Sequence, residues 1–191
     1  MAKRLVLLGI AVVSFAIPAV AAASPELRDA SGKVAVGAVI TGTSTNAAAT
    51  LTAFGPLKCS HFVLKGEVTS NTGTHIAVKG TGGHTATCFA GPEALTVTDQ
   101  SLLFMTTSSE DEGAMSLTFT ADVGPFECHF MGLDEFTYET GSSNDTIHVS
   151  GGLSTSEFCT LFDDTGVPYE PIFEADFTLT TESNGQPVFI Q

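Results

Sequence analysis

The sequence predicts an all-β protein with antiparallel strands, and three observations support this fold class. Apolar and polar residues alternate along many short segments, which is typical of strands that bury one face. Clusters of Gly, Asn, Asp, Ser and Thr separate these segments and favour turns. No segment after the first 23 residues combines helical periodicity, capping residues and adequate length. Short strands at this spacing favour an antiparallel β-sandwich, with a barrel as the alternative, because either architecture buries one face of every strand.

Residues 1–23 have the pattern of a secretory signal peptide. Lys3 and Arg4 precede an apolar run that ends in small residues, and cleavage after Ala23 is favoured over cleavage after Ala21. The apolar core is short for a membrane-spanning helix and contains Pro18. We therefore expect a secreted protein, extracellular or associated with the cell surface. Residues 24–191 are expected to form a single all-β domain that does not enter a membrane.

The predicted strands follow one another along this domain. The clearest alternation is in segment 115–123, where Met115, Leu117 and Phe119 share one face and a serine and two threonines share the other. Segment 172–180 repeats this pattern. The other candidate strands are 33–41, 61–69, 75–80, 94–99, 136–139, 147–151 and 187–191.

Two stretches of the chain share the same order of features. Residues 51–59 read LTAFGPLKC, and residues 117–128 read LTFTADVGPFEC. Gly80 and Gly151 each stand eight residues before the next cysteine. We interpret the domain as two related units, residues 32–100 and 101–182, followed by a short C-terminal strand.

The four cysteines are expected to form two disulfide bonds. An even number of cysteines in an exported chain indicates disulfides rather than metal ligands. A unit copied with its bridge intact predicts the pairs Cys59–Cys88 and Cys128–Cys159. Pairing between the units, such as Cys59 with Cys128, remains the alternative.

Charge is unevenly distributed along the chain. The formal net charge is −14, and no lysine or arginine follows Lys79. Binding to nucleic acid is disfavoured, because it needs basic groups that neutralise phosphates. Carboxylates cluster at two places and are weak candidates for a calcium site, although a solvated loop is the preferred interpretation and no metal or cofactor is expected. These residues are Glu110, Asp111, Glu112, Asp163 and Asp164.

Motifs for catalysis are weak. Asp164, Thr165 and Gly166 match the tripeptide of aspartic proteases, but the first unit has no aspartate at the matching place, and a type I turn explains the tripeptide. His61 and His129 lie close to Cys59 and Cys128, where a strand-surface position is favoured over a zinc site. His75 and His148 flank a repeated Ile/Val strand but fall on opposite sides of the aligned isoleucines. The sequence contains no Gly-x-Ser-x-Gly motif and no phosphate-binding loop. We therefore predict no catalytic residue.

Several segments of the chain resemble a known group of proteins. TLTAFGPLKC, GEVTSNTGTHIAVKG, GPFECHF and FEADFTLTTESNGQPVFIQ, together with the signal peptide, are similar to the uncharacterised secreted, cysteine-paired β-sandwich proteins of actinobacteria. The resemblance implies an exported β-protein and no particular activity.

These observations predict a secreted non-enzymatic module that binds an unknown extracellular ligand or protein, or has a structural role. One alternative is a secreted hydrolase that uses carboxylates of the acidic second unit. Another is a protein inhibitor braced by disulfides. The sequence leaves the oligomeric state open.

Overall fold

The alternating segments form strands where the sequence predicts them. In β9 (Glu112–Val123) Met115, Leu117 and Phe119 are buried, and the residues between them are half-exposed. β15 (Ile172–Thr181) alternates in the same way. The described part of the chain contains strands and turns but no helix, which confirms the all-β prediction.

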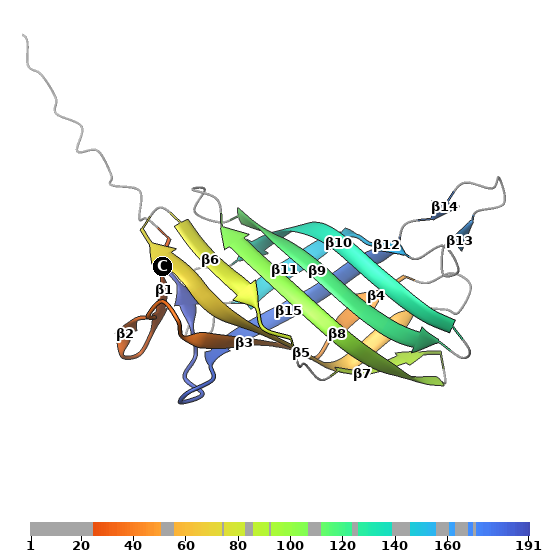
Figure 1. Ribbon diagram of the computed structural model, residues 1–191, viewed down its shortest axis with the longest axis horizontal. Helices are drawn as coiled ribbons and strands as arrows, with labels where there is room; N and C mark the ends of the chain where they lie inside the picture. The colour runs from red at the N-terminus through yellow and green to blue at the C-terminus, as the bar shows by residue number, and fades with distance from the viewer. Residues whose placement is uncertain are drawn as a thin grey trace, which may run out of the picture.

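This computed structural model describes residues 25–50, 56–73, 75–82, 86–91, 93–106, 112–123, 126–138, 146–155, 161–162, 168–169 and 171–191 (Figure 1). The other strands are β1 (Leu27–Asp29), β2 (Gly32–Lys33), β3 (Val39–Ser44), β4 (Ala47–Ala49), β5 (Leu57–Thr72), β6 (His75–Gly80), β7 (Ala86–Ala90), β8 (Glu93–Thr106), β10 (Phe126–Tyr138), β11 (Thr146–Gly152), β12 (Ser154–Thr155), β13 (Leu161–Phe162), β14 (Pro168–Tyr169) and β16 (Phe189–Ile190).

The main sheet closes on itself. Antiparallel pairing runs in the order β3, β5, β6, β8, β9, β10, β11 and β15, and β15 pairs with β3 to complete the ring. β4 extends the position of β3, because it also pairs with β5 and β15. In the same way β7 extends the position of β6 between β5 and β8. The result is an antiparallel barrel of eight positions in which neighbours in the chain are neighbours in space.

The sequence favoured a two-layer sandwich, and this architecture is not confirmed. The strand pairing forms a closed barrel, which was the alternative. Alternation shows which face of each strand is buried, and both architectures satisfy it. The pairing of β11 with β15, from Thr146 opposite Thr178 to Gly152 opposite Ile172, decides between them.

The predicted division into units 32–100 and 101–182 is not confirmed either. The boundary between Gln100 and Ser101 falls inside β8. The barrel does contain two successive runs of four positions, β3 to β8 and β9 to β15, with Cys59 and Cys128 each in the second strand of its run. The duplication itself stays a prediction.

The predicted strand 33–41 is wrong in its extent. β2 ends at Lys33 and β3 begins at Val39. Between them lies Gly37, whose φ of +88° is a conformation that glycine adopts without the steric cost of a Cβ. The chain turns there and passes from β2, in a small additional sheet, to β3 in the barrel.

That additional sheet, β16–β1–β2, covers one end of the barrel (Figure 1). Leu27 pairs with Ile190, and both side chains are buried. Asn71, at the end of β5, ties this sheet to the barrel. Its Nδ2 donates to the carbonyl oxygens of Leu27 and Val34 at 2.8 Å, and its Oδ1 accepts from the Leu27 amide at 2.9 Å. A buried amide with three such bonds offsets the cost of its own burial.

Phenylalanine rings fill the middle of the barrel. Phe119 stacks on Phe130 with ring centroids 4.7 Å apart, and Phe62 meets Phe119 edge-on at 6.0 Å. Phe173 lies 5.8 Å from Phe62. All four side chains are fully buried. Contacts among these rings come from strands on several sides, so the core is shared by the whole barrel.

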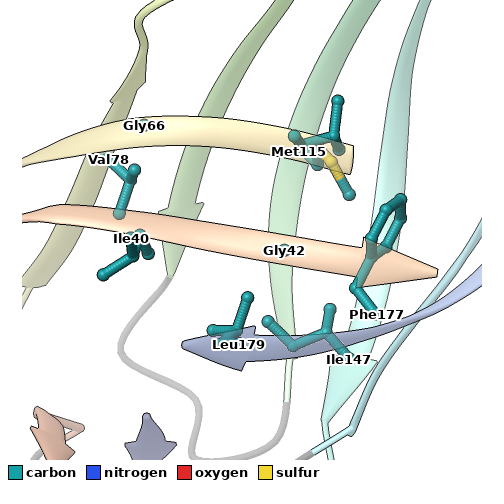
Figure 2. Close-up of a pocket in the computed structure, with 9 residues that line it drawn as sticks. Ile40, Gly42, Gly66, Val78, Met115, Ile147, Phe177 and Leu179 are labelled. Atoms are coloured by element: carbon teal, nitrogen blue, oxygen red, sulfur yellow. The ribbon is translucent and has the colours of Figure 1, made fainter. Parts of the chain in front are cut away.

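A small apolar cavity remains among the buried side chains (Figure 2), and Phe177 in its lining lies 6.2 Å from Phe62 of this cluster. Its volume is about 30 Å³, roughly the volume that one water molecule occupies in the liquid. Ligand pockets measure about 300–1,000 Å³. It is therefore too small for an organic ligand. The residues that line it are Ile40, Gly42, Leu64, Gly66, Val78, Met115, Ile147, Phe177 and Leu179.

Replacing Gly66 by alanine is expected to lower the free energy of unfolding by about 1–3 kcal/mol. A Cβ at this position would overlap Val78 Cγ1 and would lie 3.1 Å from the Lys79 carbonyl oxygen, so the Val78 side chain or the backbone of its strand must shift. Gly42→Ala is the matched control, because its Cβ would meet Leu179 Cδ2 at 3.4 Å, which is van der Waals contact. Urea denaturation of both variants should show a loss for the first only. An equal loss in both would contradict the close approach at Gly66.

Candidate functional site

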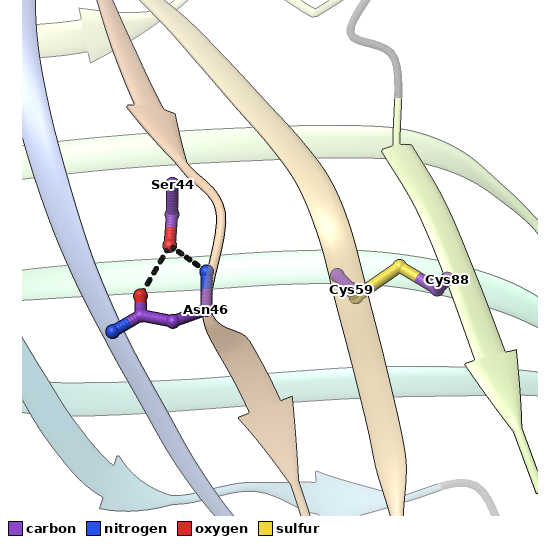
Figure 3. Close-up of a disulfide and its surroundings, with 4 residues drawn as sticks. All are labelled: Ser44, Asn46, Cys59 and Cys88. Carbon is purple, nitrogen blue, oxygen red and sulfur yellow. Dashed lines mark hydrogen bonds between the residues drawn. A yellow bond between two sulfur atoms is a disulfide. The ribbon is translucent and has the colours of Figure 1, made fainter.

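The first predicted disulfide is confirmed. Cys59 of β5 and Cys88 of β7 are direct cross-strand partners, bonded with their Cα atoms 3.9 Å apart (Figure 3). Both side chains are buried in the hydrophobic core. This bond rules out the alternative pairing of Cys59 with Cys128. It is also consistent with an oxidising compartment.

The second predicted disulfide stays a prediction. Cys128 is buried on β10, and it is not a free thiol. Its predicted partner, Cys159, lies outside the described residues.

Most of the candidate calcium ligands also lie outside the described residues, namely Glu110, Asp111, Asp163 and Asp164. Glu112 is the first residue of β9, and its side chain is not described. Within the described ranges, no three His, Cys, Asp or Glu side chains are grouped so that they could hold a metal ion. The Asp164-Thr165-Gly166 tripeptide is outside these ranges as well.

A row of polar residues crosses the outer face of three neighbouring strands. Thr137 of β10 is opposite His148 of β11, which in turn is opposite Asp176 of β15. Thr146 precedes His148 by two residues and shares its face of the strand. These four residues line a hollow of about 410 Å³ on the outer surface. We call it the polar hollow.

Hydrogen bonds fix the orientation of the histidine in this hollow. Asp176 Oδ1 lies 2.6 Å from His148 Nδ1. Asn46, in the bend between β3 and β4, donates from Nδ2 to Asp176 Oδ2 at 2.6 Å and accepts from the Asp176 amide at 3.0 Å. Ser44 donates to Asn46 Oδ1 at 2.9 Å (Figure 3) and is only 1% exposed. A chain of contacts therefore leads from a buried serine to the surface imidazole.

The charge state of Asp176 follows from these contacts. The hydrogen bond from His148, and next the one from Asn46, hold the pKa of Asp176 below its usual value. An ionised carboxylate can only accept, so His148 Nδ1 carries the hydrogen of their shared bond. When the imidazole is neutral, its Nε2 then presents a lone pair.

Asp176→Asn is expected to lower the free energy of unfolding by about 0.5–1 kcal/mol at neutral pH, because the pair is exposed and screened. Because folding lowers the pKa of Asp176, its ionised carboxylate contributes fully to the free energy of unfolding above the unfolded-state pKa of about 3.9. This contribution is lost as pH falls through the folded-state pKa. The difference between wild type and variant should therefore shrink below pH about 4. Chemical denaturation at several pH values measures it, with Glu174→Gln as a control of equal charge on the same strand. A difference that persists unchanged in acid would contradict the assignment.

A second histidine with a carboxylate partner lies elsewhere on the outer face. His129 Nε2 is 3.1 Å from Glu127 Oε1, and His129 Nδ1 is 2.9 Å from Thr120 Oγ1. The side chains of His129 and Glu127 are 60% and 63% exposed, against 54% and 43% for His148 and Asp176. They do not line the polar hollow.

Sequence reasoning missed the polar hollow. It placed His148 beside the repeated Ile/Val strand, but nothing linked that histidine to Asp176, which is 28 residues away, or to Asn46, which is 130 residues from Asp176. Spacing contains no such signal, since only the register of β11, β15 and β3 brings the three together.

The part of the chain that the structure describes has no helix with the length and hydropathy needed to cross a membrane. Comparison of the chain with protein-family models, with curated proteins and with solved structures finds no match. The role of the polar hollow is therefore inferred from its own geometry.

Proposed function

We propose that this protein is an exported binding module that acts without catalytic turnover and contacts its ligand through the polar hollow. The observation that carries the proposal is the difference between the packed inner face of the barrel and the polar hollow on its outer face. Inward-facing side chains pack around phenylalanine rings and leave a cavity of about 30 Å³. The outer face holds a hollow of about 410 Å³ lined by an oriented imidazole and hydroxyl groups. Polar groups held in fixed positions orient a ligand and give binding its specificity.

Export is part of this proposal. Cleavage after Ala23 makes Ser24 the first residue and retains Glu26, whose backbone exchanges hydrogen bonds of 2.7 and 3.0 Å with Gln191 in the sheet that covers the barrel end. N-terminal sequencing of protein recovered from the culture medium should therefore begin at Ser24. Recovery of the chain only inside the cell, with residues 1–23 retained, would count against export.

The binding role is tested with immobilised mature protein and arrays of defined peptides and glycans. Binding that is lost in His148→Gln and kept in His129→Gln supports contact through the polar hollow. Partner binding that is equal in both variants would place the contact elsewhere. A screen with peptidase, esterase and glycosidase substrates addresses turnover. Turnover that one point substitution abolishes would overturn the non-enzymatic role.

The two alternative functions receive less support. A hydrolase built on two carboxylates needs one with a raised pKa beside one that stays ionised, and Asp176, whose pKa is lowered, is the one carboxylate among the described residues that line the hollow. An inhibitor presents a loop that a disulfide braces. The Cys59–Cys88 bond instead joins two paired strands and is buried in the barrel wall.

A further inference from the structure

We infer that the polar hollow binds the guanidinium group of an arginine side chain on a partner protein. This inference rests on the proposed role of the hollow as the contact surface and names the chemistry of the partner. It follows from the groups that the hollow presents, from the charge of the surrounding chain and from the spacing of the strands.

The groups that line the hollow are mainly acceptors. Asp176 is ionised and accepts the Nδ1 hydrogen of His148, so the imidazole in its neutral form offers the Nε2 lone pair. The hydroxyl oxygens of Thr137 and Thr146 can also accept. Each oxygen of Asp176 retains acceptor capacity beyond its bonds to His148 and Asn46. A ligand that donates several hydrogen bonds therefore fits this surface.

Charge favours a cation over an anion at this place. The three strands that form the hollow belong to the part of the chain after Lys79, which contains no lysine or arginine. Among the described basic side chains, Lys65 bonds to Glu182 and Lys33 bonds to Glu26. The carboxylate of Asp176 has the neutral partners Asn46 and, in its neutral form, His148. A cationic ligand would meet a net negative field here.

Strand spacing favours guanidinium over ammonium. Neighbouring strands lie about 4.8 Å apart, so Thr137, His148 and Asp176 present acceptors on three successive strands. A guanidinium carries five N–H donors in a rigid planar fork and can bond to acceptors on two strands at once. An ammonium is a compact point charge that satisfies such an array less completely.

The test is a titration of the mature protein with Nα-acetylarginine amide, followed through the backbone amide and imidazole resonances. Shifts should centre on Thr137, Thr146, His148 and Asp176. Asp176→Asn should weaken binding by about two- to fivefold, as expected for one exposed charge. Glu174→Gln removes the same charge from a neighbouring exposed position outside the hollow and should weaken it less.

Two further probes separate this inference from the binding role itself. Nα-acetyllysine amide should bind more weakly than the arginine derivative, and Nα-acetylglutamate amide should leave the hollow resonances unshifted. Equal effects of Asp176→Asn and Glu174→Gln, or equal binding of the two cations, would overturn the inference. Preferential binding of the anionic probe in the hollow would also overturn it while leaving the hollow as a contact surface. If His148→Gln binds the partner found on the arrays as tightly as the wild type does, the proposed function fails instead.

Discussion

Replacing Phe119 by alanine is expected to lower the free energy of unfolding by about 3–5 kcal/mol. The ring is fully buried at the centre of the barrel. It stacks on Phe130 at 4.7 Å and lies 6.0 Å from Phe62 and 6.3 Å from Phe173. Its removal takes away these contacts and leaves a cavity that strands joined in a closed ring cannot collapse to fill. Urea denaturation under oxidising conditions gives the measurement.

Thr118→Ala is the matched control for this core substitution. Thr118 precedes Phe119 in β9 and is half-exposed on the opposite face. Its loss should change stability by no more than about 0.5 kcal/mol, as is usual for surface positions. A cost below 1 kcal/mol for Phe119→Ala, or equal costs for the two variants, would mean that the ring cluster is not the core of the barrel.

The double variant Cys59→Ala/Cys88→Ala is expected to lose about 3–4 kcal/mol of stability. The bond closes a segment with a sequence separation of 29, and its loss releases conformational entropy in the unfolded chain. Alanine is chosen because both sites are buried, and serine would add the cost of an unpaired hydroxyl. Because domains are stable by only about 5–15 kcal/mol, this is a large share of the total. Denaturation with and without reductant measures the loss, which should disappear when the wild type is also reduced.

Proteolytic mapping under non-reducing conditions accompanies this experiment. It should recover a peptide that links Cys59 to Cys88, and we predict a second that links Cys128 to Cys159. A peptide that links Cys59 to Cys128 would contradict the bond described here. A double variant as stable as the oxidised wild type would show that the bond adds no stability to the folded barrel.

The sequence anticipated the elements of this protein better than their assembly. β6 and β15 begin at the predicted positions because their apolar residues alternate with polar ones. The Cys59–Cys88 bond was predicted from two similar stretches, although the boundary proposed between them lies inside β8. Segment 33–41 alternates as a strand does, yet it divides at Gly37 because the sheet over the barrel end requires a turn there.

By itself, the sequence determined the all-β class and the buried face of strands such as β9, because these depend on periodicity. It also led to one disulfide, through the similar order of features in two stretches of the chain. Tertiary structure alone decided that the sheet closes and that Asn46, His148 and Asp176 meet on its outer face. Alternation specifies which side of a strand turns inward, but every strand offers the same backbone donors and acceptors to any neighbour. Which strands pair, and in which register, depends on how all the inward faces pack together around Phe119 and its neighbours. The polar hollow is a consequence of that register, since one residue of slippage between β11 and β15 would place His148 and Asp176 on opposite faces.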